Sequence, residues 1–348
     1  MFKADFTSYL LNFKSPSGTS RGVLNSKTSW FIKIWNEKEP DIFGLGECSP
    51  IVGLSIDPVE KIEGKLTEIC EKINTLDSIQ LDAFPCVKFG LETALKDLKN
   101  GGERIIYNNS FSGGESKIKI NGLIWMDDKE SMLNSIRLKI KNGYNCLKLK
   151  IGAINFKDET DLLSFIREEF NSSELEIRVD ANGAFNKGEA LEKLNILSQY
   201  NIHSIEQPIQ PNQHQALHKL CLESPIPIAL DEELIGITLE NKREELLDVI
   251  NPNFIVLKPS LLGGLASTNN WIYLAEKRNI NWWITSALES NIGLNSIAQF
   301  TAEFKNQLPQ GLGTGQIYKN NFPSFLELKT DQLSINHELK WDISNINF

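Results

Sequence analysis

The sequence predicts an α/β protein in which a modified TIM barrel, (β/α)7β, is combined with a smaller α+β domain. Three observations predict this fold. The length of 348 residues is about twice that of a usual domain, which suits two domains or one large barrel. Strand-like segments precede helical patterns in the first third of the chain, without alternation. From about residue 117, strands and helices alternate strictly, as in a barrel of parallel strands.

The first third predicts an α+β domain over residues 1–115. Two strand-like segments and then two helical patterns are expected at 2–14, 21–36, 57–74 and 86–99. A Ser/Pro/Gly stretch at 15–18 predicts a loop between the strands, and the Gly/Pro-rich segment 44–50 is expected to break regular structure. Asp57, which precedes a proline, predicts the N-cap of the first helix.

The remainder predicts the barrel over residues 116–315. Seven apolar strands are expected at 118–125, 146–151, 175–180, 203–206, 226–230, 254–258 and 282–286. Helical patterns follow them at 129–142, 157–170, 187–200, 212–222, 239–247, 264–278 and 292–305. Residues 310–314 would supply an eighth strand, and the tail 316–348 would return to the first domain. Crossovers of this length imply parallel pairing.

The main alternative to the barrel is an open doubly wound sheet. No G-x-G-x-x-G follows the first strand of the alternating region, and no G-x-x-x-x-G-K-[ST] occurs in the chain. The nucleotide-binding versions of that sheet therefore lose support, and the barrel is the favoured fold.

Composition excludes several classes of function. With 36 Lys+Arg against 45 Asp+Glu, the net charge of −9 argues against nucleic acid or an anionic membrane as partner. No stretch approaches the ~20 apolar residues of a membrane helix, and no signal peptide is recognisable. The five cysteines form no C-x-x-C pair. We expect a cytoplasmic protein that acts on a small molecule; its oligomeric state is not indicated.

Charged residues stand at the ends of strands that should be apolar. Lys148 and Lys150 share one face of the second strand, although an isolated K-x-K would indicate a solvated edge strand. The next four strands end on Asp180, Glu206, Asp231 and Lys258. Their spacings of 26, 25 and 27 residues match one βα unit each, so the same height is sampled on successive strands. Carboxyl ends of barrel strands form the face where active sites lie.

Three carboxylates at one point repel each other unless a cation lies between them. Ligation by oxygen alone favours Mg²⁺, with Mn²⁺ as the alternative. For any single carboxylate, a helix N-cap is the competing interpretation. Lysines on strands two and six would flank the α-carbon of a bound small-molecule carboxylate. This predicts abstraction of its α-proton to an ene-diolate that the metal stabilises.

With these features the sequence resembles the enolase superfamily and its muconate-lactonising-enzyme subgroup. Enzymes of this superfamily use a lysine or histidine base together with metal ions that stabilise an ene-diolate. Within the subgroup it is most similar to the o-succinylbenzoate synthases. The resemblance spans essentially the whole chain and implies a capping domain, a (β/α)7β barrel and a C-terminal return to the capping domain. The residues that carry it are Lys148-Leu-Lys150, Arg178-Val-Asp180-Ala-Asn182, Glu206-Gln-Pro208, Asp231-Glu232, Lys258-Pro259 and the run 285–294.

The resemblance also implies roles. Asp180, Glu206 and Asp231 match Mg²⁺ ligands. Lys150 matches the base that removes the α-proton and then, as its ammonium, protonates the departing hydroxyl. Lys258 matches the lysine that stabilises the intermediate from the opposite face. Substrate contacts are implied for Lys148, Arg178, Asn182, Ser286, Glu289, Ser290 and Gly313.

The implied reaction is the syn dehydration of 2-succinyl-6-hydroxy-2,4-cyclohexadiene-1-carboxylate to 2-succinylbenzoate in menaquinone biosynthesis, a carbon–oxygen lyase reaction. Racemisation of N-acyl amino acids or epimerisation of dipeptides is the alternative, with Lys150 and Lys258 as opposed bases. The stretch 313–315 lacks the Asp-x-Asp that similar dipeptide epimerases carry there. A non-catalytic scaffold would have lost some of the six strand-end charges, and all are present. The loop residues 19–21 are a hypothesis for a segment that closes over the substrate.

Overall fold

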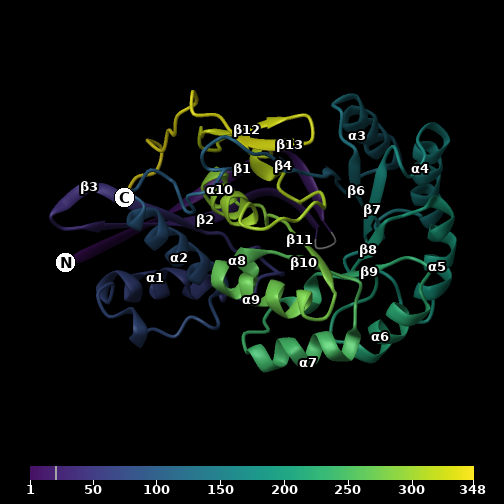
Figure 1. Ribbon diagram of the computed structural model, residues 1–348, viewed down its shortest axis with the longest axis horizontal. Helices are drawn as coiled ribbons and strands as arrows, with labels where there is room; N and C mark the ends of the chain where they lie inside the picture. Colours follow the sequence, from purple (N-terminus) through teal and green to yellow (C-terminus); the bar gives the residue numbers. More distant parts are fainter. Residues whose placement is uncertain (20–21) are drawn as a thin grey trace.

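A computed structural model describes residues 1–19 and 22–348, so Ser20 and Arg21 of the suggested closing loop lie outside the described residues. Figure 1 shows two parts: the N-terminal strands and helices (purple to blue) on the left, and a curved wall of strands with outer helices (teal to green) on the right. The C-terminal segment (yellow) runs back above the N-terminal part. The predicted fold class, a modified TIM barrel with a capping domain, is confirmed.

The capping domain begins with an antiparallel sheet of three strands. These are β1 (Phe2–Thr19), β2 (Gly22–Asn36) and β3 (Glu39–Cys48), in the order β1-β2-β3. The loop predicted at 15–18 is wrong, because β1 continues through this stretch with a register shift between Asn12 and Ser17. Such an irregularity accommodates a turn-forming composition within a strand.

Two helices, α1 (Ile62–Glu71) and α2 (Pro85–Lys99), and two short 3-10 helices, η1 (Val59–Lys61) and η2 (Leu76–Ser78), follow the sheet. The break predicted at 44–50 is wrong, because β3 extends to Cys48. A Cβ on Gly44 or Gly46 would lie 1.9 Å from a carbonyl oxygen of α2. These glycines therefore serve the close packing of α2 on β3.

Asp57 does not cap the helix that follows it. No side chain caps η1, whose first flanking residue is Pro58. Instead the Asp57 Oδ1 accepts a hydrogen bond of 3.0 Å from the backbone N–H of Cys86, in the first turn of α2. The sequence predicts the capping residue type correctly but assigns it to the wrong helix.

The barrel wall is a parallel sheet in the order β11-β10-β9-β8-β7-β6-β5. Its strands are β5 (Gly122–Ile124), β6 (Cys146–Lys150), β7 (Glu176–Asp180), β8 (Ser204–Glu206), β9 (Ile228–Leu230), β10 (Phe254–Leu257) and β11 (Asn281–Ile284). Because the strands follow each other in chain order, the sheet is not doubly wound, which would reverse direction at a switch point.

Helices cover the outer face of this sheet (Figure 1). The helices of this part of the chain are α3 (Lys129–Lys141), α4 (Phe156–Glu169), α5 (Ala190–Leu197), α6 (His214–Glu223), α7 (Glu240–Ile250), α8 (Pro259–Leu262), α9 (Leu265–Glu276) and α10 (Asn291–Thr301). The 3-10 turns η3 (Ser198–Tyr200), η4 (Glu232–Leu234) and η5 (Thr314–Gln316) lie in the connections. Alternate strand residues such as Leu147 and Leu149 are buried in the main apolar cluster. The charged residues between them therefore point into the barrel.

The barrel closes through isolated bridges. Gln310 pairs with Ile120 and Gly311 pairs with Thr285, both in parallel, so this segment lies where an eighth strand is expected. The strand predicted at 118–125 is divided, because β4 (Ile118–Lys119) pairs with β13 (Gln332–Ile335) and only β5 joins the parallel sheet.

The C-terminal segment forms the hairpin β12 (Leu326–Lys329) and β13 and also contacts β1. Tyr318 pairs with Phe13, and the Lys319 N–H donates to the Asn12 carbonyl over 2.8 Å. The domain limits 1–115, 116–315 and 316–348 stay predictions. Among the described residues, no helix combines the length and apolar character needed to span a membrane.

Candidate active site

A cavity of about 180 Å³ lies at the carboxyl ends of the barrel strands, under the capping domain. From the barrel, its wall includes Lys148, Lys150, Asn182, Glu232, Lys258, Thr285, Ser286, Gly311, Gly313 and Thr314. From the capping domain, Leu24, Ile51, Val52 and Leu54 contribute an apolar side. The cavity therefore combines cationic groups at its base with an apolar cover, which suits a small anionic ligand with a hydrocarbon body.

The strand register brings the predicted charges together. Lys150 pairs with Asp180 between β6 and β7, and Asp180 pairs with Glu206 between β7 and β8. The chain leaves β8 through Gln207, whose φ is 37°. The Gln207 Oε1 accepts the Asp231 N–H over 3.2 Å, which fixes the end of β9 beside β8. Successive strand ends thus present one charged row, here called the strand-end cluster: Lys148, Lys150, Asp180, Glu206, Asp231 and Lys258.

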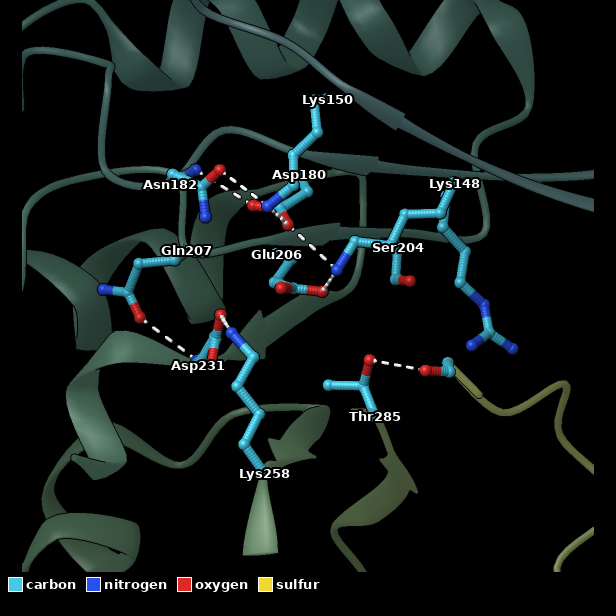
Figure 2. Close-up of polar contacts among 12 residues, drawn as sticks. Lys148, Lys150, Asp180, Asn182, Ser204, Glu206, Gln207, Asp231, Lys258 and Thr285 are labelled. Carbon is cyan, nitrogen blue, oxygen red and sulfur yellow. Dashed lines mark hydrogen bonds and ion pairs between the residues drawn. The ribbon is translucent and has the colours of Figure 1, made fainter. Parts of the chain in front are cut away.

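Lysines and carboxylates are paired throughout this cluster (Figure 2). The Lys148 Nζ lies 2.9 Å from the Asp180 Oδ2 and 2.5 Å from the Glu206 Oε2. The Lys150 Nζ lies 2.6 Å from the same Asp180 oxygen. Lys258 forms an ion pair with Asp231. Figure 2 shows Lys150 and Lys258 reaching the carboxylates from opposite sides.

Burial and charge shift the pKa values in this cluster. Burial would lower the pKa of Lys148, but the carboxylates of Asp180 and Glu206 outweigh it and raise the pKa. Burial would raise the pKa of Asp180, but the Lys148 and Lys150 ammonium groups hold it below its usual range. For Glu206, burial and the Asp180 carboxylate raise the pKa well above its usual range. A further cation would relieve this repulsion between carboxylates.

The three carboxylates of the strand-end cluster are ligands of the type that a hard divalent cation prefers, although their side chains do not converge on a single point. Within the described ranges, no three acidic, histidine or cysteine side chains converge closely enough to hold an ion as they stand. The lysine ammonium groups provide the countercharge instead. Yet the buried Glu206 Oε1 has no hydrogen-bond partner in the part of the chain that the structure describes, which is a costly state for a carboxylate oxygen. Three carboxylates on adjacent strand ends offer the all-oxygen ligation that Mg²⁺ prefers.

Asn182 ties Lys150 to a carboxylate outside the row. The Asn182 Oδ1 accepts a hydrogen bond of 2.8 Å from the Lys150 Nζ, and its Nδ2 donates over 2.9 Å to the Glu232 Oε1. Glu232 is a cavity residue for which the sequence predicts no role. Strand alternation would turn it away from Asp231, but η4 starts at Glu232 and ends the alternation. Its adjacency to Asp231 is the signal that could have drawn attention to it.

Three residues predicted to contact the substrate do not line the cavity. Arg178 is buried below the cavity, where its guanidinium lies 4.4 Å from the Trp283 ring centroid and donates to the Pro309 carbonyl. It shares a face with Asp180 but sits two residues deeper in the barrel. Glu289 and Ser290 are fully buried and do not line the cavity. Lys148, Asn182, Ser286 and Gly313 line the cavity, and the substrate contacts of all seven residues stay predictions.

Comparison with known proteins defines the family. Residues 131–335 match the enolase C-terminal domain-like family. The o-succinylbenzoate synthase of Desulfotalea psychrophila is 46% identical, over 93% of this chain and 96% of its own length. The chain belongs to the enolase superfamily. The predicted resemblance is confirmed, and the protein is an enzyme of this superfamily.

Solved structures agree with this assignment. The crystal structure of MenC from D. psychrophila has a TM-score of 0.87 at 41% identity, covering 96% of this chain and 99% of that chain. A Cytophaga hutchinsonii dipeptide epimerase, complexed with Mg and the dipeptide D-Ala-L-Val, has a TM-score of 0.82 at 21% identity and covers 99% of this chain and 98% of that chain. At that identity the second structure shows only the shared fold.

Proposed function

We propose that the protein is an Mg²⁺-dependent o-succinylbenzoate synthase. It would dehydrate the succinyl-hydroxycyclohexadiene carboxylate named above to 2-succinylbenzoate, in menaquinone biosynthesis. One observation carries the proposal: Lys150 and Lys258 reach a row of three carboxylates from opposite sides, at the base of a cavity with an apolar cover. The 46% identity to a named o-succinylbenzoate synthase over nearly the whole chain supports the choice of substrate.

Asp180, Glu206 and Asp231 would hold the cation in this proposal. When bound, Mg²⁺ supplies positive charge that stabilises the developing negative charge on the substrate carboxylate. Lys148, which pairs with two of these carboxylates, is close enough to the ligands to hold a substrate oxygen beside them. Its ammonium would orient the carboxylate and add to the stabilisation of charge.

Lys150 would move the proton in both steps. As the neutral amine, its Nζ takes the proton from the α-carbon, and the C–H electron pair enters the carboxylate as an ene-diolate. The Nζ then returns this proton to the departing hydroxyl. The C–O bond breaks, water leaves and the ring becomes aromatic. Because one group serves both steps on one face, the elimination is syn.

Lys258 would remain an ammonium on the opposite face. Its charge would stabilise the ene-diolate without transferring a proton. Its pKa supports this role, since burial would lower it but the carboxylates of Asp231 and Glu232 raise it above the usual lysine value. Thr285 and Ser286, on the cavity wall, offer hydroxyl groups for the oxygen atoms of the succinyl chain.

The test is direct conversion of the precursor. Purified protein with Mg²⁺ should form 2-succinylbenzoate, which is followed by its aromatic absorbance, and Lys150→Ala should abolish the reaction. Formation of product by Lys150→Ala at the wild-type rate would contradict the assigned mechanism. Absence of product with the wild type would contradict the proposed function itself.

A second candidate is racemisation of N-acyl amino acids or epimerisation of dipeptides. The opposed lysines favour it, and the D-Ala-D/L-Ala epimerase of C. hutchinsonii is 28% identical over 83% of this chain and 80% of its own length. Within the described residues, the one acidic side chain on the cavity wall is Glu232, which accepts from Asn182. The wall thus offers little to hold a dipeptide ammonium. Incorporation of deuterium from D₂O at the α-carbon of an N-acyl amino acid, with turnover, would establish this activity.

A further inference from the structure

A second buried group of charges lies between the capping domain and the barrel, outside the proposed chemistry. It consists of Lys27 on β2, Glu47 and Ser49 at the end of β3, and Glu289 and Ser290 between β11 and α10; we call it the interdomain cluster. Lys27 is 8% exposed and the other four are fully buried. A buried ammonium is costly unless charged and polar groups compensate it, so this lysine requires an explanation.

Glu47 attaches the capping sheet to α10. Its carboxylate accepts from the Ser290 hydroxyl over 2.6 Å and from the backbone N–H groups of Ser290 and Gly293, each over 3.0 Å. These N–H groups lie at the start of α10, where a negative charge is stabilised by the unpaired amides and the helix dipole. A strand of one domain thus caps a helix of the other.

Lys27 holds the loop that precedes this helix. Its Nζ donates to the Ser49 hydroxyl and, over 3.3 Å, to the backbone carbonyl of Leu288. The same carbonyl accepts from the Tyr318 hydroxyl over 2.7 Å. Leu288 has a φ of 64°, a left-handed conformation that a bulky residue rarely adopts. Such a conformation persists only where its surroundings hold it.

Glu289 connects this loop to the cavity wall. Its carboxyl group accepts from the Ser260 hydroxyl over 2.5 Å, from the Ser286 hydroxyl and from the Ala287 N–H over 2.7 Å. Ser286, Ala287 and Leu288 all line the cavity. Burial lowers the pKa of Lys27, and the carboxyl groups of Glu47 and Glu289 offset only part of this effect. Both acidic groups therefore face the ammonium from different elements.

We propose that Lys27 is a positioning residue for the substrate. From the capping sheet, its ammonium holds the Leu288 carbonyl, balances Glu47 and Glu289, and so fixes the wall formed by residues 286–288. The inference rests on the proposed function for its substrate. It assigns Lys27 an effect on binding, because the lysine touches neither the strand-end cluster nor the cavity.

Lys27→Met tests this role, with Lys33→Met on the same strand as control. Lys33 stacks over the Phe43 ring at 4.5 Å, away from the loop. In Lys27→Met we expect KM for the precursor to rise about tenfold while kcat changes less than about threefold. In the ligand-free protein, backbone amides of residues 286–293 should exchange hydrogen at least about tenfold faster than in the wild type. Lys33→Met should change neither quantity.

The outcomes separate the two proposals. Unchanged exchange at 286–293 in Lys27→Met, or faster exchange with an unchanged KM, would overturn the positioning role. Wild-type protein without turnover would instead overturn the proposed function, and the exchange measurement would then decide alone whether Lys27 fixes the loop. If Lys27→Met fails to fold because Glu47 and Glu289 are left without a cation, Lys27→Met/Glu289→Gln removes one carboxyl group. This double variant should fold and show the same faster hydrogen exchange at residues 286–293. Exchange at the wild-type rate in this variant would also overturn the positioning role of Lys27.

Discussion

The strand-end cluster and the interdomain cluster use the same components, buried lysines and carboxylates, but they differ in how their oxygen atoms are satisfied. In the interdomain cluster, Glu47 is held by two backbone N–H groups and by hydroxyls. In the strand-end cluster, lysines are the main partners of the carboxylates, and the Glu206 Oε1 has no hydrogen-bond partner among residues 1–19 and 22–348. A fully hydrogen-bonded group of charges fixes a structure, whereas one that lacks partners retains the capacity to bind.

The largest effect is expected from the removal of Lys150 from the strand-end cluster. Lys150→Ala should lower kcat for dehydration by about 10²- to 10⁴-fold, since it removes the group that moves the proton. Circular dichroism should show an unchanged fold. Lys33→Ala, on the capping sheet, is the control and should retain wild-type kcat. A loss of less than about threefold in Lys150→Ala would assign the proton transfer to another group.

The second-largest effect is expected on Mg²⁺ binding, which should depend on the strand-end cluster and not on the interdomain cluster. Treatment with a chelator should abolish turnover and added Mg²⁺ should restore it. Glu206→Gln should weaken Mg²⁺ binding at least about tenfold in titration calorimetry, because a charged ligand is lost. Glu289→Gln is the matched control from the interdomain cluster and should leave Mg²⁺ affinity unchanged. Equal effects of the two variants would mean that the carboxylates on the strand ends are not the ligands.

The packing of the interdomain cluster predicts a smaller effect, on stability. A Cβ on Gly293 would lie 2.7 Å from the Glu289 Cβ and 3.0 Å from the Glu47 Oε2. Although alanine is the better helix former, Gly293→Ala should reduce the free energy of unfolding by about 1–3 kcal/mol, because the site is overpacked. Gly188→Ala, where the new Cβ meets nothing within 4 Å, should not be destabilised. Urea denaturation of both variants checks this comparison.

The smallest expected effect concerns a lone buried carboxyl group, Asp57, which has no lysine partner among the described residues. Burial raises its pKa to about 6 from a usual 3.8. The folded state therefore binds its proton more tightly than the unfolded state, so its contribution to stability declines as pH rises from about 4 to about 6. Asp57→Asn should flatten this decline by about 1–2 kcal/mol between pH 4.5 and pH 7. Identical pH dependence in both proteins would contradict the raised pKa.

The sequence predicts the strand-end cluster well because two periodicities govern it. Alternation along a strand puts Lys148 and Lys150 on one face, and the length of a βα unit repeats one height around the barrel. Alternation gives the face of a strand but not how far along it a residue lies, which is why Arg178 is predicted at the cavity although it is not part of the cavity wall. Nor does it extend beyond a strand end, where η4 brings Glu232 to the cavity wall.

The interdomain cluster could not be predicted in this way. Its capping-domain members and its barrel members are separated by more than two hundred residues of sequence, and no local pattern links Glu47 to Ser290. The same holds for Asp57, which lies before η1 and whose partner Cys86 is 29 residues away in α2. Glycines 44 and 46 suggest a break in isolation, and only the approach of α2 explains them. Partners chosen by tertiary packing leave little trace in a single sequence.

The pairing of Phe13 with Tyr318 has a consequence for synthesis. The outer edge of β1 is completed by residues 317–320, and the Tyr9 hydroxyl donates to the Asn320 carbonyl across 311 positions of sequence. On a ribosome that adds roughly 5–20 residues per second, this edge waits many seconds for its partner. An unpaired strand edge is a site for aggregation. We therefore expect nascent chains to need protection by chaperones until the barrel has emerged.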